Sequence, residues 1–283
     1  MNSIMKLCLR EKILIFKKFF IGKSAKQEQK SDVAFAFVGI EPGDEGEDRD
    51  RKNTEIYSRN LEDLRKNRKE RPNQKIVSIV YGGSVLDLAE VAELSDAVIL
   101  AWYPGEQGGL AIARTIFGLN NPGGRLPLTY MEKNGEKADI KDYKLPGRTY
   151  LYADKKPLFP FGYGLSYTTF GYSGIKAAAK GGKVGVQVTV TNTGKLTGDE
   201  VVQLYVKSPE GSGDRRIHHL EGFKRVTLKP GESRKVSFVL SKDQLAQFGM
   251  DGKQSLAKGA YTFFVGGGQP GFTAGVQSAK LAF

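Results

Sequence analysis

Residues 32–52 read DVAFAFVGIEPGDEGEDRDRK, and the interpretation of the whole chain starts from this stretch. It begins with a short apolar run without alternation, which is typical of a strand covered on both faces, as in a parallel sheet. At Gly39 the run gives way to a loop. Open α/β sheets bind their ligands where strands end, so this loop lies where such a fold does its chemistry. The loop carries six carboxylates, Glu41, Asp44, Glu45, Glu47, Asp48 and Asp50.

Two interpretations of the acidic loop are open from its own residues, a solvated surface loop and a functional loop at a sheet edge. The following segments favour a sheet. Apolar runs at 76–80 and 97–101 predict two more strands, and glycine-containing turns follow at 82–83 and 102–109. Repeated β-loop-α units predict a mostly parallel sheet with right-handed crossovers, an α/β architecture. The helices expected in this part span 55–71, 85–94 and 110–117.

The sequence changes character at about residue 175. Apolar side chains at every second position, such as Val184, Val186 and Val188, indicate strands with one buried face. Turn residues separate several such strands at short intervals. The pattern predicts an all-β sandwich of immunoglobulin-like type, preceded by an aromatic-rich connector at 158–170.

The cysteine and histidine content excludes several kinds of site. The single cysteine, Cys8, permits no intrachain disulfide and no multi-cysteine metal site. The two histidines, His218 and His219, are adjacent, and we expect them on the surface of a sandwich loop rather than at a metal. A histidine-based catalytic triad or zinc site is therefore hard to build from this chain.

The formal net charge of +12 raises the question of a nucleic-acid partner. Residues 1–30 hold eight Lys/Arg against two Glu, and residues 59–75 hold seven Lys/Arg against three Asp/Glu. Neither segment interleaves aromatic or glycine residues with its basic ones, as a stacking surface for bases does. We interpret the excess charge as solvated helix faces and expect no nucleic-acid partner.

Residues 1–30 form a basic leader of uncertain structure. Lysines interrupt its apolar residues, so no run reaches the roughly 18 residues that span a membrane. Its apolar centre at 13–16 is too short for a convincing signal peptide, which leaves the compartment undetermined. A basic amphipathic helix on a membrane surface, a helix packed on the sheet, and a start codon inside a longer reading frame stay open as explanations.

Six motifs follow one another along the chain: WYPGEQGG (102–109), NPGGRLPLTY (121–130), GRTY (147–150), PLFPFGYGLSYTTF (157–170), VTNTGKLTGDEVVQLYV (190–206) and GFKRVTLKPGESRKVSF (222–238). Together they resemble family-3 glycoside hydrolases, the enzymes of β-glucosidase and β-xylosidase type. The resemblance runs in order through residues 31–270. The last motif resembles the fibronectin type III-like domain at the carboxyl end of these enzymes.

This resemblance implies that a complete enzyme contains an amino-terminal TIM-type barrel, an α/β sandwich and a fibronectin type III-like domain. A barrel needs about 250 residues, which 1–30 cannot hold. We therefore expect the carboxyl-terminal portion of such an enzyme. Its parts would be the leader (1–30), an incomplete α/β sandwich domain (31–174) and the fibronectin type III-like domain (175–283). The barrel would then be supplied from elsewhere, for instance by a separate chain.

The resemblance also implies retaining hydrolysis of β-linked glucosides or xylosides by two carboxylates, without a cofactor. The nucleophilic aspartate would lie on the barrel, and the acid/base glutamate in a loop that often reads Glu-Gly-x-Asp-Arg. Residues 45–49 match this pattern and indicate Glu45, whereas counting back from Asp50-Arg51 indicates Glu47. Both are candidates. A general acid needs a raised pKa, which neighbouring carboxylates can supply.

A second hypothesis treats the chain as a non-catalytic carbohydrate-binding or interaction module. The aromatic pair Trp102 and Tyr103 motivates it, and Trp102 is the candidate for contact with a sugar. A third treats the chain as a truncated product without a role of its own. Arg125 and Arg148 could pair with buried carboxylates or simply anchor loops, and we expect anchoring.

Overall fold

The computed structural model describes residues 31–49, 51–131, 141, 143, 145, 147–153, 155–249 and 252–282. The leader at 1–30 and Asp50 of the acidic loop lie outside the described residues. The chain divides into two compact units. The first contains the described residues up to Leu119, with Tyr130 and Met131, and the second contains Asn120–Thr129 and the described residues beyond 138.

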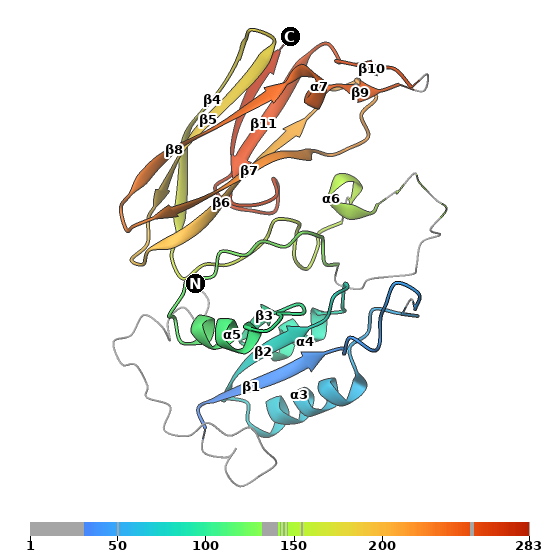
Figure 1. The fold of residues 1–283 in the computed structure, drawn as a ribbon, viewed down its shortest axis with the longest axis vertical. Helices are drawn as coiled ribbons and strands as arrows, with labels where there is room; N and C mark the ends of the chain where they lie inside the picture. The colour runs from blue at the N-terminus through green and yellow to red at the C-terminus, as the bar shows by residue number, and fades with distance from the viewer. Residues whose placement is uncertain are drawn as a thin grey trace. The chain divides into compact units, whose positions relative to one another are not determined.

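The first unit is built on a three-stranded parallel sheet of order β1-β2-β3 (Figure 1). Phe37 of β1 pairs with Ile79 of β2, which pairs with Ile99 of β3. Ile79, in the middle strand, is fully buried. The predicted parallel sheet with intervening helices is therefore confirmed. Its elements are β1 (Val33–Gly39), α3 (Ser58–Glu70), β2 (Lys75–Tyr81), α4 (Ala89–Leu94), β3 (Ala97–Leu100) and α5 (Gly108–Ile116).

Strand β1 departs from its prediction in the covering of its two faces. Val38 is buried, but the neighbouring Phe37, which points to the opposite face, is 52% exposed and stacks on Tyr81 with ring centroids 6.2 Å apart. The expectation that β1 is covered on both faces is therefore wrong for the part of the chain that the structure describes. Because β1 is an edge strand of this sheet, its side chains have fewer neighbours than those of β2.

The helix expected at 85–94 is shorter in the structure and begins only at Ala89. Leu86 and Leu88 are both buried. Asp87, which lies between them, forms hydrogen bonds with Thr54. Its backbone N–H donates to the carbonyl of Thr54 (2.8 Å), and its carboxylate accepts from the Thr54 hydroxyl (2.9 Å). This long-range pairing ties Asp87 to a distant segment of the chain and holds it outside the helix that begins at Ala89.

The second unit is a sandwich of two antiparallel sheets, of order β12-β11-β6-β7 and β4-β5-β8 (Figure 1). The all-β prediction for this part of the chain is confirmed. A separate pair, β9 and β10, forms a small two-stranded sheet. The elements are α6 (Thr149–Tyr152), β4 (Phe170–Lys180), β5 (Lys183–Asn192), β6 (Gly198–Lys207), β7 (His219–Leu228), β8 (Ser233–Ser241), α7 (Lys242–Leu245), β9 (Gln247–Phe248), β10 (Gln254–Ser255), β11 (Ala260–Gly266) and β12 (Gln277–Ala282).

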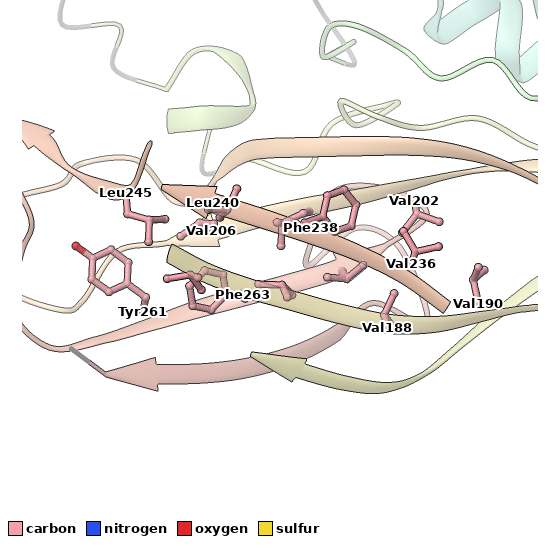
Figure 2. Packing of buried hydrophobic residues seen from close by; sticks show 14 of the residues in the cluster. Val188, Val190, Val202, Val206, Val236, Phe238, Leu240, Leu245, Tyr261 and Phe263 are labelled. Carbon is pink, nitrogen blue, oxygen red and sulfur yellow. The ribbon is translucent and has the colours of Figure 1, made fainter. Parts of the chain in front are cut away.

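The sandwich core follows from the alternation in the sequence. Val188 on β5, Val236 and Phe238 on β8, and Phe263 on β11 lie among the side chains that Figure 2 shows between the two sheets. Each of these residues is at most 6% exposed. Strict period two along each strand sends one set of side chains inward, and burial of that set supplies the apolar contact that holds the sheets together.

The segment Asn120–Thr129 is held against the sandwich by a buried ion pair. Nη2 of Arg125 lies 3.0 Å from Oε2 of Glu200 on β6, and both side chains are at most 9% exposed. The hydroxyl of Tyr172 donates to the other carboxylate oxygen of Glu200 (2.8 Å). Arg125 thus anchors its loop by pairing with a buried carboxylate, which combines the two roles considered for it.

The expectation that His218 and His219 are surface residues is wrong, since each is only 4% exposed. The ring of His218 meets the ring of Tyr205 edge to face at 5.4 Å, and the ring centroid of Tyr150 lies 6.3 Å from that of His218. Both histidines lie at the start of β7, and the rings beside His218 come from Tyr150 of α6 and Tyr205 of β6. Because the rings of Tyr150 and Tyr205 pack beside His218, burial rather than loop exposure sets the chemistry of this histidine.

Candidate functional site

The candidate site lies at the carboxyl edge of the parallel sheet, where the loops after β1, β2 and β3 meet. The backbone N–H of Ile40, just after β1, donates to the carbonyl of Tyr81 at the end of β2 (3.1 Å). After β3, the N–H of Ala101 donates to the carbonyl of Val80 (2.9 Å). These bonds carry the sheet pairing into the loops, so the acidic loop lies beside the glycine turn and the aromatic turn, as the sequence predicts.

Glu45 joins the three loops through its carboxylate. Its Oε1 accepts hydrogen bonds from the backbone N–H of Gly83 (2.8 Å) and from the hydroxyl of Tyr103 (2.8 Å). Its Oε2 accepts from the hydroxyl of Ser84. Two of these donors follow β2 and one follows β3, so a residue of the β1 loop is fixed by both neighbouring loops.

Local backbone geometry makes room for this arrangement. A Cβ on Gly83 would lie 2.9 Å from Oε1 of Glu45 and 2.7 Å from Cε2 of Tyr103, closer than real Cβ contacts. Trp102 adopts a left-handed backbone with φ of 55°, which is uncommon for a residue other than glycine. Such backbone strain persists only where surrounding contacts enforce it, and here it directs the chain just before Tyr103.

The charge state of Glu45 differs from the expectation of a raised pKa. Partial burial raises the pKa of Glu45, but hydrogen bonds from Ser84, Tyr103 and Gly83 lower it more, and the net pKa lies below the usual value. The physical cause is that all three donors stabilise the ionised carboxylate. In the described chain Glu45 is therefore held as a carboxylate, the form in which a base works.

Glu47, the other acid/base candidate, is in a different environment. It is exposed, and no hydrogen bond or ion pair joins its side chain to another described residue. It lies in a tight turn in which Gly46 and Arg49 exchange backbone hydrogen bonds of 3.3 and 3.1 Å. The structure thus brings Glu45, but not Glu47, together with the loops that follow the other two strands.

Asp44 and Trp102 are two further residues of these loops. The carboxylate of Asp44 accepts from the hydroxyl of Tyr57 and from the backbone N–H of Glu41 (2.7 Å). These bonds close the loop on itself and lower the pKa of Asp44, the Tyr57 bond most. Trp102 is half-buried, and its carbonyl oxygen accepts a long hydrogen bond from the N–H of Gly82 (3.5 Å).

Sequence reasoning missed Tyr103 and Ser84 as partners of Glu45. Both stand next to residues that were noted, one after Trp102 and one after the glycine pair. No spacing rule predicts that their hydroxyls reach the same carboxylate, because Ser84 and Tyr103 follow different strands and approach Glu45 from two separate loops. The available signal was only that hydroxyl-bearing residues follow two neighbouring strand ends.

The described residues contain no group of three or more His, Cys, Asp or Glu side chains arranged to hold a metal ion. No helix among them has both the length and the apolar content needed to cross a membrane.

Comparison with protein families gives two matches along the chain. Residues 16–167, more than half of the chain, match the glycosyl hydrolase family 3 C-terminal domain. Residues 200–269 match the fibronectin type III-like domain. The acidic loop, the glycine turn and the aromatic turn all fall within the first match.

Individual proteins are similar over most of the chain. It is 37% identical to a β-xylosidase of Formosa agariphila over 267 residues, which is 89% of this chain and 36% of that protein. It is 33% identical to a periplasmic β-glucosidase of Salmonella typhimurium over 262 residues, 87% of this chain and 34% of that protein. The crystal structure of a GH3 β-glucosidase from Bifidobacterium adolescentis is similar with a TM-score of 0.79 and 29% identity, covering 93% of this chain and 42% of that one. The chain thus spans about a third of the length of the Formosa β-xylosidase and of the Salmonella periplasmic β-glucosidase.

Proposed function

The chain belongs to glycosyl hydrolase family 3, as the carboxyl-terminal part of a β-glucosidase- or β-xylosidase-type member, and on this premise we propose that it supplies the acid/base residue of a retaining β-glycosidase. The residue proposed is Glu45. The substrate class is a β-linked glucoside or xyloside, the class named for its relatives. The observation that carries the proposal is the carboxylate of Glu45 fixed by donors from two neighbouring loops at the carboxyl edge of the sheet.

The proposed reaction has two steps and needs no cofactor. In the first, the protonated carboxyl of Glu45 gives its proton to the glycosidic oxygen while a second carboxylate attacks the anomeric carbon and the bond to the leaving group breaks. In the second, the ionised Glu45 takes a proton from water as that water attacks the same carbon and releases the enzyme carboxylate. The two carboxyl groups must lie about 5–5.5 Å apart for this outcome.

The second carboxylate is proposed to come from a barrel that this chain does not provide. Asp44, the nearest acidic neighbour in sequence, is engaged by Tyr57 and by its own loop backbone, which supports a closing role for it rather than a nucleophilic one. The barrel would belong to a longer polypeptide or to a separate chain. On this proposal, the chain by itself has little or no hydrolytic activity.

A complementation experiment tests the assignment. The chain alone should not turn over xylobiose, cellobiose or their nitrophenyl analogues. Adding the separately produced amino-terminal two-thirds of the Formosa β-xylosidase should restore turnover, which Glu45→Gln should lower by about 10²–10⁴-fold, the usual contribution of a general acid/base. The loss should be larger for xylobiose than for the nitrophenyl xyloside, whose leaving group needs little protonation.

Glu47→Gln is the matched control, since it removes one carboxylate from the same loop and should leave turnover within a few-fold. A result in which Glu47→Gln is inactive and Glu45→Gln is not would reverse the assignment. Turnover by the chain alone that disappears in Glu45→Gln would contradict the role proposed for the barrel.

A second candidate function is carbohydrate binding without catalysis. The exposure of Tyr103 (41%) next to Trp102 favours it, because sugars stack on aromatic side chains at accessible sites. Trp102 is the only tryptophan, so its fluorescence reports directly on this turn. Saturable fluorescence changes with xylobiose or cellobiose, together with no turnover in the complemented enzyme, would favour this function over the first.

A further inference from the structure

The hydroxyl of Tyr103 is aimed at Glu45 by two separate features of the backbone. The left-handed conformation of Trp102 turns the chain immediately before Tyr103. On the other side, the missing Cβ of Gly83 leaves the space in which the Tyr103 ring and the Glu45 carboxylate approach each other. We propose that Tyr103 is a positioning residue, which fixes the Glu45 carboxylate at the sheet edge through the 2.8 Å hydrogen bond.

Tyr103 acts as the donor in this pair. Partial burial and the neighbouring Glu45 raise the pKa of Tyr103 to about 12, so its hydroxyl keeps its proton at neutral pH. A donor of this kind stabilises the ionised carboxylate more than the protonated carboxyl group. Tyr103 therefore favours the base form of Glu45, and Ser84 and the Gly83 N–H act in the same direction.

The consequence for the reaction rests on the function proposed above. A retaining glycosidase needs the acid/base residue protonated in its first step and ionised in its second. Tyr103 would assist the second step and would oppose the first, because its bond must weaken when Glu45 takes up a proton. Loss of the Tyr103 hydroxyl should then extend the first step to higher pH.

Direct titration of Glu45 tests the proposal without any activity. The chain labelled with ¹³C at the glutamate side-chain carboxyl is titrated by NMR, and the Glu45 signal is assigned by its absence in Glu45→Gln. In Tyr103→Phe the midpoint of this signal should move to higher pH than in the unchanged chain. An unchanged midpoint in a folded Tyr103→Phe variant would overturn the proposal.

Matched variants separate the effect of the Tyr103 hydroxyl on the Glu45 titration from general effects of substitution in these loops. Tyr57→Phe removes a hydroxyl from the bond to Asp44 in the same loop, and it should leave the Glu45 midpoint unchanged. Gly83→Ala should raise the Glu45 midpoint as Tyr103→Phe does, since the new Cβ pushes the carboxylate and the ring apart. Gly43→Ala is its control, because a Cβ there meets nothing within 4 Å. If Tyr103→Phe fails to fold, Gly83→Ala decides: a midpoint equal to that of Gly43→Ala overturns the proposal.

The complemented enzyme separates the two proposals. If Glu45→Gln abolishes turnover, the alkaline limb of kcat/KM for xylobiose should move to higher pH in Tyr103→Phe and stay in place in Tyr57→Phe. If Glu45→Gln has no effect on turnover, the catalytic role of Glu45 fails, while the NMR titration still decides whether Tyr103 positions its carboxylate. A limb that stays in place in Tyr103→Phe, in an enzyme that needs Glu45, contradicts the positioning role.

Discussion

Asp199 and Glu200 are neighbours on β6, and their side chains point to opposite faces of the strand. Glu200 is buried, and Arg125, its partner, is buried with it. Asp199 pairs with Arg225, whose side chain is 63% exposed, and its carboxylate also accepts from Thr227 (2.6 Å). Since water screens the second pair and not the first, two adjacent carboxylates contribute to stability in very different ways.

Removal of the two arginines should show this difference. Arg125→Ala leaves the Glu200 charge buried without its partner and should lower the free energy of unfolding of the second unit by about 3–5 kcal/mol. Arg225→Ala breaks an exposed pair and should lower it by only about 0.2–1 kcal/mol. Urea unfolding at pH 7, followed by circular dichroism, measures both values.

The loss of unfolding free energy caused by Arg125→Ala should become smaller as the pH is lowered. Burial raises the pKa of Glu200 even with Arg125 present, and loss of the arginine raises it further. The folded variant can then bind a proton that the unfolded chain does not hold, so acid restores stability to it relative to the unchanged protein. Equal losses for the two arginine variants at pH 7 would mean that the Arg125–Glu200 pair is solvated.

At the candidate site, the sequence predicts where Glu45 lies but not what holds it. The apolar run before Gly39 and the turns after the next two strands place three loops at one edge of a sheet, and the structure has them there. The lowered pKa of Glu45 was not predictable, because it depends on donors from Ser84 and Tyr103 that are far apart in sequence. Side-chain direction at a strained turn is a tertiary property, which local patterns do not encode.

At the scale of single elements, strands β5 and β8 show how far a period-two pattern determines packing. They pair in antiparallel register, with Val186 opposite Phe238 and Gly185 opposite Val239. Residues that share a register position share a face, so Val186 and Phe238 face the core, whereas Val239 is 66% exposed. Valine therefore occurs on both faces of this sheet, and only its position in the alternation decides its burial.

Valine-to-alanine changes on the two faces should lower the free energy of unfolding by different amounts. Val188 on β5 is fully buried, so Val188→Ala removes buried carbon atoms and leaves a cavity, which should cost about 2–3 kcal/mol. Val239→Ala on β8 changes an exposed side chain and should cost less than about 1 kcal/mol, mainly through strand propensity. Thermal and urea unfolding of the two variants give the comparison. A larger loss for Val239→Ala would indicate that the outer face is covered in solution.

The helices were less predictable than the strands. The apolar spacing at 85–94 fits a helix, yet the helix begins only at Ala89, and Asp87 instead pairs with Thr54, which is 33 positions earlier. The burial of His218 and His219 was also missed, and the rings that pack beside His218 come from Tyr150 and Tyr205, which are distant in sequence. Local patterns thus predicted elements whose partners are near in sequence and failed where a distant segment decides.

On the scale of the whole molecule, the two units have separate cores and can be observed separately. The single tryptophan, Trp102, lies in the first unit. The second unit contains buried tyrosines, including Tyr205 and Tyr261. Tryptophan fluorescence therefore reports on the parallel sheet, and tyrosine signals in near-ultraviolet circular dichroism report mainly on the sandwich.

Acid should weaken the second unit through His218. Burial first, and then the neighbouring His219 and Lys207, lower the pKa of His218 from 6.5 to about 4. Between these values the unfolded chain binds a proton that the folded chain does not, so this contribution to stability is complete above pH 6.5 and is lost as the pH falls toward 4. Between pH 7 and pH 5 the loss should be about 2 kcal/mol.

A ring-preserving variant isolates this effect from the other titrating groups. Nε2 of His218 has no hydrogen-bond partner among the described residues, so His218→Phe keeps the aromatic packing without removing a bond and should be about as stable as the unchanged chain at pH 7. At pH 5 it should be the more stable of the two in urea unfolding followed by the tyrosine signals. Glu200, whose raised pKa acts with the opposite sign, is the same in both chains and cancels from the difference. An equal loss of stability between pH 7 and pH 5 in His218→Phe and in the unchanged chain would assign the acid sensitivity to another group. A loss seen only in tryptophan fluorescence would place the acid-sensitive group in the first unit.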